Sequence, residues 1–478
     1  MTTREIAAAL TRRRFLLIAT AAAAGSVTAA CSAPASGPVL AATSGPTPPG
    51  STPIDPTSLG SSSPSQPAST GPSGSVGVPV GAPQPLRGTG SRRTPGAPDA
   101  ARKALADFGA DFLREARRLD PTAVNTASSP YSLFTVLAMA RAGAKGATAS
   151  QIDAALHSAG TDAQGAVISA VDAGVAAAIA AGENSAQDGD EPLVVRTANQ
   201  TWVQNGYPVH QEYLDALAVQ FGVEAVAADF AGDPEGVRTA LNAWVAQRTN
   251  NLIPDLFPRG SIHPTTVVVL VNALYLKAPW MRPFSKIGAT TFITAQGIRI
   301  KTPMMQSAAA VNGVVGDGWT AASIPYRGGG ATMTVLVPDA GRFDAVLKAL
   351  DSTLMGRAAD GEDEMALTMP LFDLETTSPA KKIANSLGIE DIFAGADLSG
   401  IAGAPGQLVA TAFVHQAVVK VNEKGTEAAA ATAMGISESS VPAPPPLHLV
   451  VDRPFLFWIS ETATGAPLFL GVVTDPSA

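Results

Sequence analysis

The sequence is poor in cysteine, in charge and in aromatic side chains, and these shortages exclude several classes of protein. Its 478 residues include a single cysteine, Cys31, so no intramolecular disulfide can form. Charged residues make up only 15% of the chain and the net charge is -8, which argues against a general affinity for nucleic acid. The hydrophobic fraction of 46% is nevertheless typical of a chain that buries a large core.

The spacing patterns of metal and catalytic sites are also missing. The five histidines form no paired ligand motif such as His-x-x-x-His. No phosphate-binding glycine loop or nucleophile elbow stands out, and the acidic run Glu362-Asp363-Glu364 is typical of a solvated turn. We therefore predict a protein that is not an enzyme and that needs no metal or cofactor.

The N-terminus has the features of an export signal. A twin-arginine pattern stands directly before the apolar run of residues 15–24, which is too short to cross a bilayer. Small residues then lead to Cys31, and the pattern resembles a bacterial lipoprotein signal whose cysteine is acylated. We expect residues 1–31 to direct export and a lipid on Cys31 to anchor the protein to the membrane at the cell surface. The alternative is a cleavable signal that ends near Ala30.

Residues 32–97 are rich in proline, serine, glycine and threonine and have almost no aromatic or charged side chains. Such a composition buries too little apolar surface to offset the entropy of ordering, so we expect a disordered linker. Its mean reach is on the order of 45 Å, enough to hold a domain clear of the cell envelope. The folded domain is expected to comprise residues 98–478.

Within this domain, helical patterns come first and strand patterns later. Apolar residues recur at helical spacing over residues 99–118, 210–221 and 234–249, and Ser129-Pro130 indicates a capped helix start. Strand-like runs cover residues 267–275, 333–337, 414–421, 447–459 and 468–473. This order, without regular alternation, predicts an α+β domain.

Several widely separated motifs follow one another in a fixed order along this domain. They are Asn125 with Ser129-Pro130-Tyr131-Ser132, residues 266–280, Pro303-Met304-Met305, residues 396–400, His415, Glu423, residues 452–457 and residues 467–471. Together they resemble the serpin family. The resemblance implies a serpin fold with three β-sheets, about eight or nine helices and an exposed reactive loop at about residues 423–446.

The resemblance also implies an inhibitor that acts as a suicide substrate. A target serine protease, or alternatively a cysteine protease, would cut the loop and be trapped while the loop inserts into the main sheet. The hinge of that loop would comprise Glu423, Gly425, Thr426, Glu427, Ala428, Ala429, Ala430, Ala431 and Thr432. A monomer is expected, and a non-inhibitory binding protein that is cleaved as a simple substrate is the alternative.

The residues of the hinge suit insertion between two existing strands, which demands small side chains and no proline. Alternate residues face the core, and the inward set Thr426, Ala428, Ala430 and Thr432 is small and uncharged. Glu427 falls in the outward set. The competing interpretation is a helix, because the alanine run has high helix propensity.

By the same resemblance the cleaved bond lies between Ser439 and Ser440, within a window that includes Glu438, Val441, Pro442 and Ala443. The stretch between Gly425 and Asp452 contains no lysine or arginine, which makes trypsin-like enzymes poor targets. The small residues favour an elastase- or subtilisin-like target, with cleavage after Glu438 by a glutamate-specific protease as the alternative.

The resemblance further implies a group of residues that controls opening of the sheet, namely Ser129, Ser132, Asn272, His415 and Trp280. Relatives often carry a lysine where this chain has Leu371, so we expect Glu423 to lack its usual partner and the protein to convert readily to a latent form. No polyanion activator is expected, because no lysine or arginine lies between Lys145 and Arg196.

Overall fold

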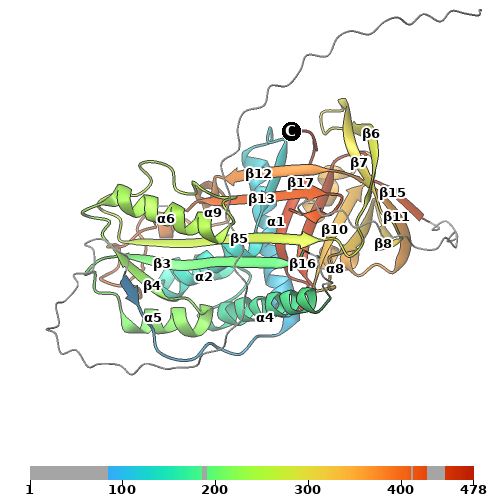
Figure 1. Cartoon of the computed structure of the whole chain (residues 1–478). Helices are drawn as coiled ribbons and strands as arrows, with labels where there is room; N and C mark the ends of the chain where they lie inside the picture. The colour runs from blue at the N-terminus through green and yellow to red at the C-terminus, as the bar shows by residue number, and fades with distance from the viewer. Residues whose placement is uncertain (1–83, 186–190, 411–412, 428–446) are drawn as a thin grey trace, which may run out of the picture. The chain divides into compact units, whose positions relative to one another are not determined.

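The computed structural model describes residues 84–185, 191–410, 413–427 and 447–478 (Figure 1). The export signal, Cys31, most of the expected linker, hinge residues Ala428 to Thr432 and the whole window around Ser439 lie outside these residues. Predictions that concern those parts therefore remain predictions.

The main sheet runs across the molecule, and its described part has seven strands. In spatial order they are β1 (Gln84–Leu86), β4 (Ala225–Ala228), β3 (Val194–Gln204), β5 (Val268–Pro279), β14 (Gly425–Thr426), β13 (His415–Asn422) and β12 (Phe372–Ser378). The short strand β14 pairs antiparallel with both of its neighbours. Within the described residues no ladder joins β5 directly to β13, so backbone strand pairing connects them only through β14.

The second sheet has ten described strands. They are β2 (Asn125–Ser128), β17 (Pro467–Val473), β16 (Phe455–Glu461), β10 (Ala331–Pro338), β9 (Trp319–Pro325), β8 (Val311–Gly316), β11 (Asp363–Pro370), β7 (Arg299–Gln306), β6 (Ser285–Ile293) and β15 (Leu447–Val450). The expected three sheets thus appear as two. The reason is β11, which pairs with β8 at its beginning and with β7 at its end and so joins two sheets into one.

Nine α-helices occur in the described residues, in agreement with the expected eight or nine. They are α1 (Pro98–Leu119), α2 (Pro130–Gly143), α3 (Gly146–Ala155), α4 (Thr161–Ser185), α5 (Gln211–Ala216), α6 (Pro234–Arg248), α7 (Phe343–Ala349), α8 (Ser352–Ala359) and α9 (Ala380–Ser386). A π-helical turn, Leu217–Phe221, continues α5. The Ser129 side chain caps α2 by accepting from the Ser132 N–H, and Pro130 occupies its first turn, as the sequence predicts.

Helices cover both faces of the main sheet. The side chains of β5 alternate between these two faces and so pack against helices on each. Val269, Val271 and Ala273 belong to the apolar cluster under α6, whereas Leu274 and Leu276 belong to the larger core shared with α1 and α2. Figure 1 shows α6 and α2 on opposite sides of the strands. By length and composition α4 could cross a membrane, but 56% of its apolar window is buried within the domain, as in a core helix.

The domain begins earlier than the sequence predicts. Residues 84–97, assigned above to a disordered linker, are ordered on the domain: β1 pairs antiparallel with β4 at the edge of the main sheet. The Thr89 backbone N–H donates to Asp215 Oδ1 at 2.6 Å, and Arg92 Nη2 lies 2.7 Å from Asp172 Oδ2. The composition of residues 32–97 as a whole conceals this docking, which depends on backbone pairing and on a few arginines.

The strand prediction over residues 447–459 was wrong in one respect. The run is divided into β15 and β16, which lie in different parts of the second sheet. Pro454 precedes β16 and has no backbone N–H to donate to a ladder, so the continuous apolar pattern does not form one strand.

Candidate functional site

The hinge begins as a strand, because β14 is already seated in the main sheet. The Trp280 N–H donates to Lys424 O at 2.8 Å and the Phe284 N–H donates to Glu423 O at 2.7 Å. A Cβ at Gly425 would lie 2.2 Å from Ala278 O, so only glycine permits this approach to β5. The described start of the hinge, Gly425–Thr426, is therefore extended, whereas the alanine run to which the helical interpretation applies lies outside the described residues.

Thr426 is the first inward-facing residue of the hinge and is only 3% exposed. Its hydroxyl lies 2.7 Å from the hydroxyl of Tyr326, which is fully buried. The sequence placed Thr426 in the inward set, and the structure puts its side chain there.

The next residue, Glu427, marks where the extended path changes. Its φ of 54° lies in the left-handed region that non-glycine residues rarely adopt. The Glu427 N–H still donates to Lys420 O at 2.8 Å, and Tyr275 Oη donates to Glu427 Oε1 at 3.4 Å. The carboxylate thus lies on the outward face, as expected, but it is half-buried there and burial raises its pKa.

Trp280 directly follows β5 and packs beside the hinge at the end of the main sheet. It is fully buried and stacks on Tyr326 with ring centroids 4.5 Å apart and an interplanar angle of 10°. Its Nε1–H donates to Asn422 O at 2.9 Å. One indole therefore connects the end of β5 to the end of β13, the two strands that β14 separates.

Glu423 lacks the lysine that relatives carry in place of Leu371, but it has another cationic partner. Lys286 Nζ lies 3.3 Å from Glu423 Oε1, so β6 supplies the ammonium that Leu371 cannot. The backbone hydrogen bond between Phe284 and Glu423 brings the start of β6 to this position. Because the Lys286 side chain is 63% exposed, the pair contributes at most about 1 kcal/mol. The pair gives Glu423 a cationic partner, and the tendency to latency stays a prediction.

Beneath the sheet, three of the expected opening-control residues meet. The Ser129 N–H donates to His415 Nε2 at 3.0 Å and the Ser132 N–H donates to Ser129 Oγ at 3.1 Å. The acceptor role of Nε2 assigns the imidazole proton to Nδ1. His415 is buried beside Phe112, and this burial lowers its pKa to about 4.

Asn272 belongs to another group, so the four polar residues do not form one cluster. It lies on β5 and its Nδ2 donates to Asn199 Oδ1 on β3, and among the described residues no hydrogen bond joins it to Ser129, Ser132 or His415. The pairing partners of β5 decide this, since no ladder joins β5 to β13 within the described residues.

A partly buried ionic network, which the sequence patterns do not predict, ties the N-terminal segment to α2 and α4. Tyr131 Oη donates to Asp172 Oδ1 at 2.6 Å, and Arg92 pairs with the other oxygen of the same carboxylate. Burial raises the pKa of Asp172. The only sequence signal was Tyr131 itself, which lies within the Ser129 to Ser132 motif.

We predict that stability falls in acid because of His415. Its folded-state pKa of about 4 is below the ordinary value of 6.5, so the unfolded chain binds the extra proton first. Stability is therefore lost as the pH falls from about 6.5 to about 4, by up to about 3 kcal/mol. Urea unfolding of the wild type and of His415→Gln at several pH values checks this.

The difference between the two proteins isolates His415, since both retain Asp172 and Glu461. Burial raises the pKa of these carboxyl groups, so their contributions have the opposite sign and cancel in the comparison. Equal loss of stability in both proteins would show that His415 is not responsible.

No group of three or more metal-ligating side chains occurs in the part of the chain that the structure describes. The hinge instead shows a structural arrangement for strand insertion. The strand β14, which begins at Gly425, lies between the ends of β5 and β13 and pairs with both. Such a position can accept a further strand, because in the described part of the chain no ladder joins β5 to β13 below β14.

Comparison with known proteins agrees with this geometry. The family model described as "Serpin (serine protease inhibitor)" matches residues 103–476. A "Serine protease inhibitor" from Cyanea capillata is 33% identical over 365 residues, covering 74% of this chain and 93% of the relative. "Iris" from Ixodes ricinus is 32% identical over 384 residues and covers 78% and 98%.

Among solved structures, Serpin48 of the insect Tenebrio molitor, titled a highly specific serpin, superposes with a TM-score of 0.63 at 26% identity. The match covers 78% of this chain and 98% of that one. The family match, the two relatives and this fold agree over the same part of the chain. The chain therefore belongs to the serpin family of serine protease inhibitors.

Proposed function

We propose that this protein inhibits its target by the suicide-substrate route, with the reactive bond between Ser439 and Ser440. The nucleophilic oxygen of the protease attacks the carbonyl carbon of Ser439, the peptide bond breaks, and Ser440 leaves with a new amino group. The acyl-enzyme ester then persists only if the loop inserts into the main sheet faster than water hydrolyses it.

The observation that carries this proposal is the position of β14. Gly425 and Thr426 already bond to both strands that would flank an inserted loop. Insertion then needs only that Ala428, Ala430 and Thr432 follow Thr426 into the same face. All three are small and uncharged, so none places a charge in the core.

The test is a covalent adduct with a protease. We expect incubation with elastase- and subtilisin-type enzymes to produce a band that survives SDS and contains both chains. The released C-terminal peptide, identified by its mass, should begin at Ser440 or within the window from Glu438 to Ala443. Clean cleavage without adduct, by every enzyme that cuts the loop, would instead favour a non-inhibitory binding protein.

We infer the class of target protease from the side chains on both sides of the proposed bond. Small residues on both sides of the proposed bond suit a shallow, apolar specificity pocket, as in elastase- and subtilisin-type proteases. A glutamate-specific protease that cuts after Glu438 is the second candidate, and the same peptide mass distinguishes the two.

We also propose that the protein is exported and acts at the cell surface. The twin-arginine pattern and the position of Cys31 support this, and lipidation of Cys31 would anchor a monomer beside the membrane. Metabolic labelling with a fatty acid, compared between the wild type and Cys31→Ser, tests the anchor.

A further inference from the structure

One region of this acidic protein carries only positive charge. Between residues 256 and 316 there are six cations and no aspartate or glutamate, although the chain as a whole has a net charge of -8. Four of the six, Arg282, Lys286, Arg299 and Lys301, lie in the segment 281–306, which includes β6 and β7. The charge is therefore concentrated in one hairpin.

Most of this charge is free to meet a partner. Of the four cations, Lys286 pairs with Glu423, whereas Arg282, Arg299 and Lys301 have no carboxylate partner among the described residues. Among the residues that the structure describes, Lys301 Nζ donates only to the Thr291 hydroxyl, at 3.1 Å. Arg299 and Lys301 alternate along β7 and are both exposed, so they share one face of the hairpin.

Apolar side chains are exposed beside these cations. Ile287 is 42% exposed on β6 and Ile298, before β7, is 59% exposed. Exposed apolar residues rimmed by unpaired cations are typical of surfaces that bind another protein, where an uncharged patch is bordered by polar groups.

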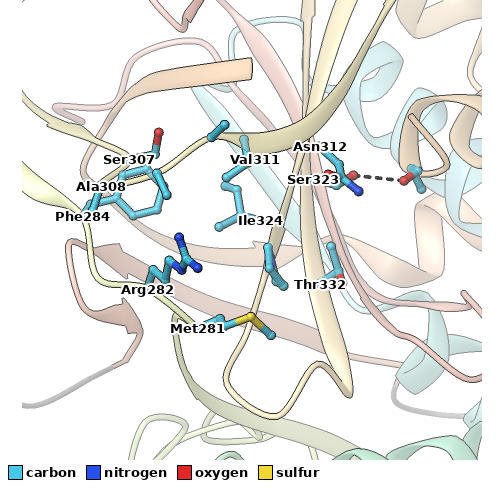
Figure 2. Close-up of a pocket in the computed structure, with 14 residues that line it drawn as sticks. Met281, Arg282, Phe284, Ser307, Ala308, Val311, Asn312, Ser323, Ile324 and Thr332 are labelled. Atoms are coloured by element: carbon cyan, nitrogen blue, oxygen red, sulfur yellow. Dashed lines mark hydrogen bonds between the residues drawn. The ribbon is translucent and has the colours of Figure 1, made fainter. Parts of the chain in front are cut away.

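A cavity of about 400 Å³ adjoins this surface (Figure 2). Arg282 reaches into it beside Phe284, and Val311 and Asn312 form the opposite wall, as Figure 2 shows. Met281, 46% exposed, lies at its edge. The cavity thus offers a guanidinium and an apolar wall together, which suits an acidic side chain carried on a partially apolar segment.

One end of the hairpin, formed by the start of β6 and the end of β7, lies where the reactive loop starts and returns, and Arg299 and Lys301 lie five to seven residues farther along β7. The hinge begins at Glu423, which bonds to Phe284 and Lys286 at the start of β6. The chain resumes in β15, which pairs with β11, and β11 pairs with β7. A protease that acts on the loop must therefore approach the β6–β7 hairpin.

We propose that the β6–β7 hairpin and the adjoining cavity form a docking surface for an acidic face of the target protease. This inference rests on the proposed inhibitory function and adds the charge of the partner to it. Opposite charges on the two proteins accelerate encounter, an effect that falls steeply with ionic strength. The surface would thus favour acidic proteases over basic ones that cut the same loop.

The test compares Arg299→Glu/Lys301→Glu with the wild type. The rate constant of adduct formation is measured at low and high salt, against one acidic subtilisin-type and one basic elastase-type enzyme. With the acidic enzyme at low salt we expect a loss of at least about tenfold, which shrinks as salt is added. The basic enzyme should react as fast as before or faster, and the stoichiometry of inhibition should stay unchanged because the hinge is intact.

The matched control is Lys348→Glu/Lys382→Glu, which changes the net charge equally at two exposed lysines outside the hairpin. An equal loss of rate in both double variants would overturn the docking surface, since only net charge would then matter. Arg282→Gln, a single exposed change, should lower the rate with the acidic enzyme by a smaller factor, and no change there would remove the cavity from the surface.

Two further outcomes are distinguishable. Absence of any adduct with wild type would contradict the inhibitory function itself, whatever the variants do. A rate that changes in Arg299→Glu/Lys301→Glu only when heparin is present would make the hairpin a polyanion site and would overturn the protease surface.

Discussion

Replacing Thr426 with arginine is expected to convert this protein from an inhibitor into a substrate. Thr426 is 3% exposed, its hydroxyl lies 2.7 Å from that of Tyr326, and its backbone pairs with Ala278 and Val421. A guanidinium in this position would be buried without a counter-charge, which costs several kcal/mol. The loop would then insert slowly, and water would hydrolyse the acyl-enzyme first.

The measurement is the ratio of adduct to cleaved protein after reaction with one protease. Because every 1.4 kcal/mol corresponds to about a tenfold change, a cost of several kcal/mol predicts a fall in that ratio of at least about tenfold. Cleavage of the loop should continue at a similar rate, which shows that the variant is folded and recognised.

Thr426→Ser is the matched control, since serine keeps the hydroxyl that reaches Tyr326 and loses only a methyl group. It should form adduct nearly as well as the wild type. If Thr426→Arg also kept its adduct, insertion of the loop would not require a buried, uncharged residue 426, and the proposed role of this position would be wrong.

The second large effect is expected at Trp280. Trp280→Ala removes the largest buried side chain at the top of the sheet, together with the stack on Tyr326 and the hydrogen bond to Asn422 O. Large-to-small changes of this kind cost about 3–5 kcal/mol. Urea unfolding followed by circular dichroism should show a correspondingly lower midpoint with an unchanged slope.

Trp280→Phe distinguishes packing from hydrogen bonding at this site. Phenylalanine can still pack against Tyr326 but cannot donate to Asn422 O, so its cost should be closer to about 1 kcal/mol for the lost bond plus a small cavity term. Equal costs for the two variants would show that the hydrogen bond, and not the stack, holds β5 to β13.

Much of the fold could be read from local patterns, because some elements are specified by residues close together in the chain. The start of α2 is an example: a serine cap, a proline in the first turn and an apolar periodicity lie within a few residues of one another. The beginning of the hinge is another, since a glycine followed by a small residue suits close approach to a neighbouring strand.

Other features depend on which distant segments pair, and local patterns do not contain that information. Residues 84–97 have the composition of a linker, yet β1 adds to the sheet because the edge of β4 is available to it. The separation of Asn272 from His415 is a consequence of the same kind, because strand order and not sequence distance decides which polar side chains meet.

The sequence by itself determined the family and the α+β class, because both depend on residues in a recognisable order. Only the tertiary structure decided that Lys286 supplies the partner of Glu423, and that the hairpin carrying Arg299 and Lys301 starts beside the hinge. The physical reason is that the interaction between two charges depends on their distance in space. Lys286 and Glu423 are about 130–140 positions apart in the chain, and folding brings them within hydrogen-bonding range. A lysine missing from one position of a family pattern was therefore no proof that its charge was missing from the site.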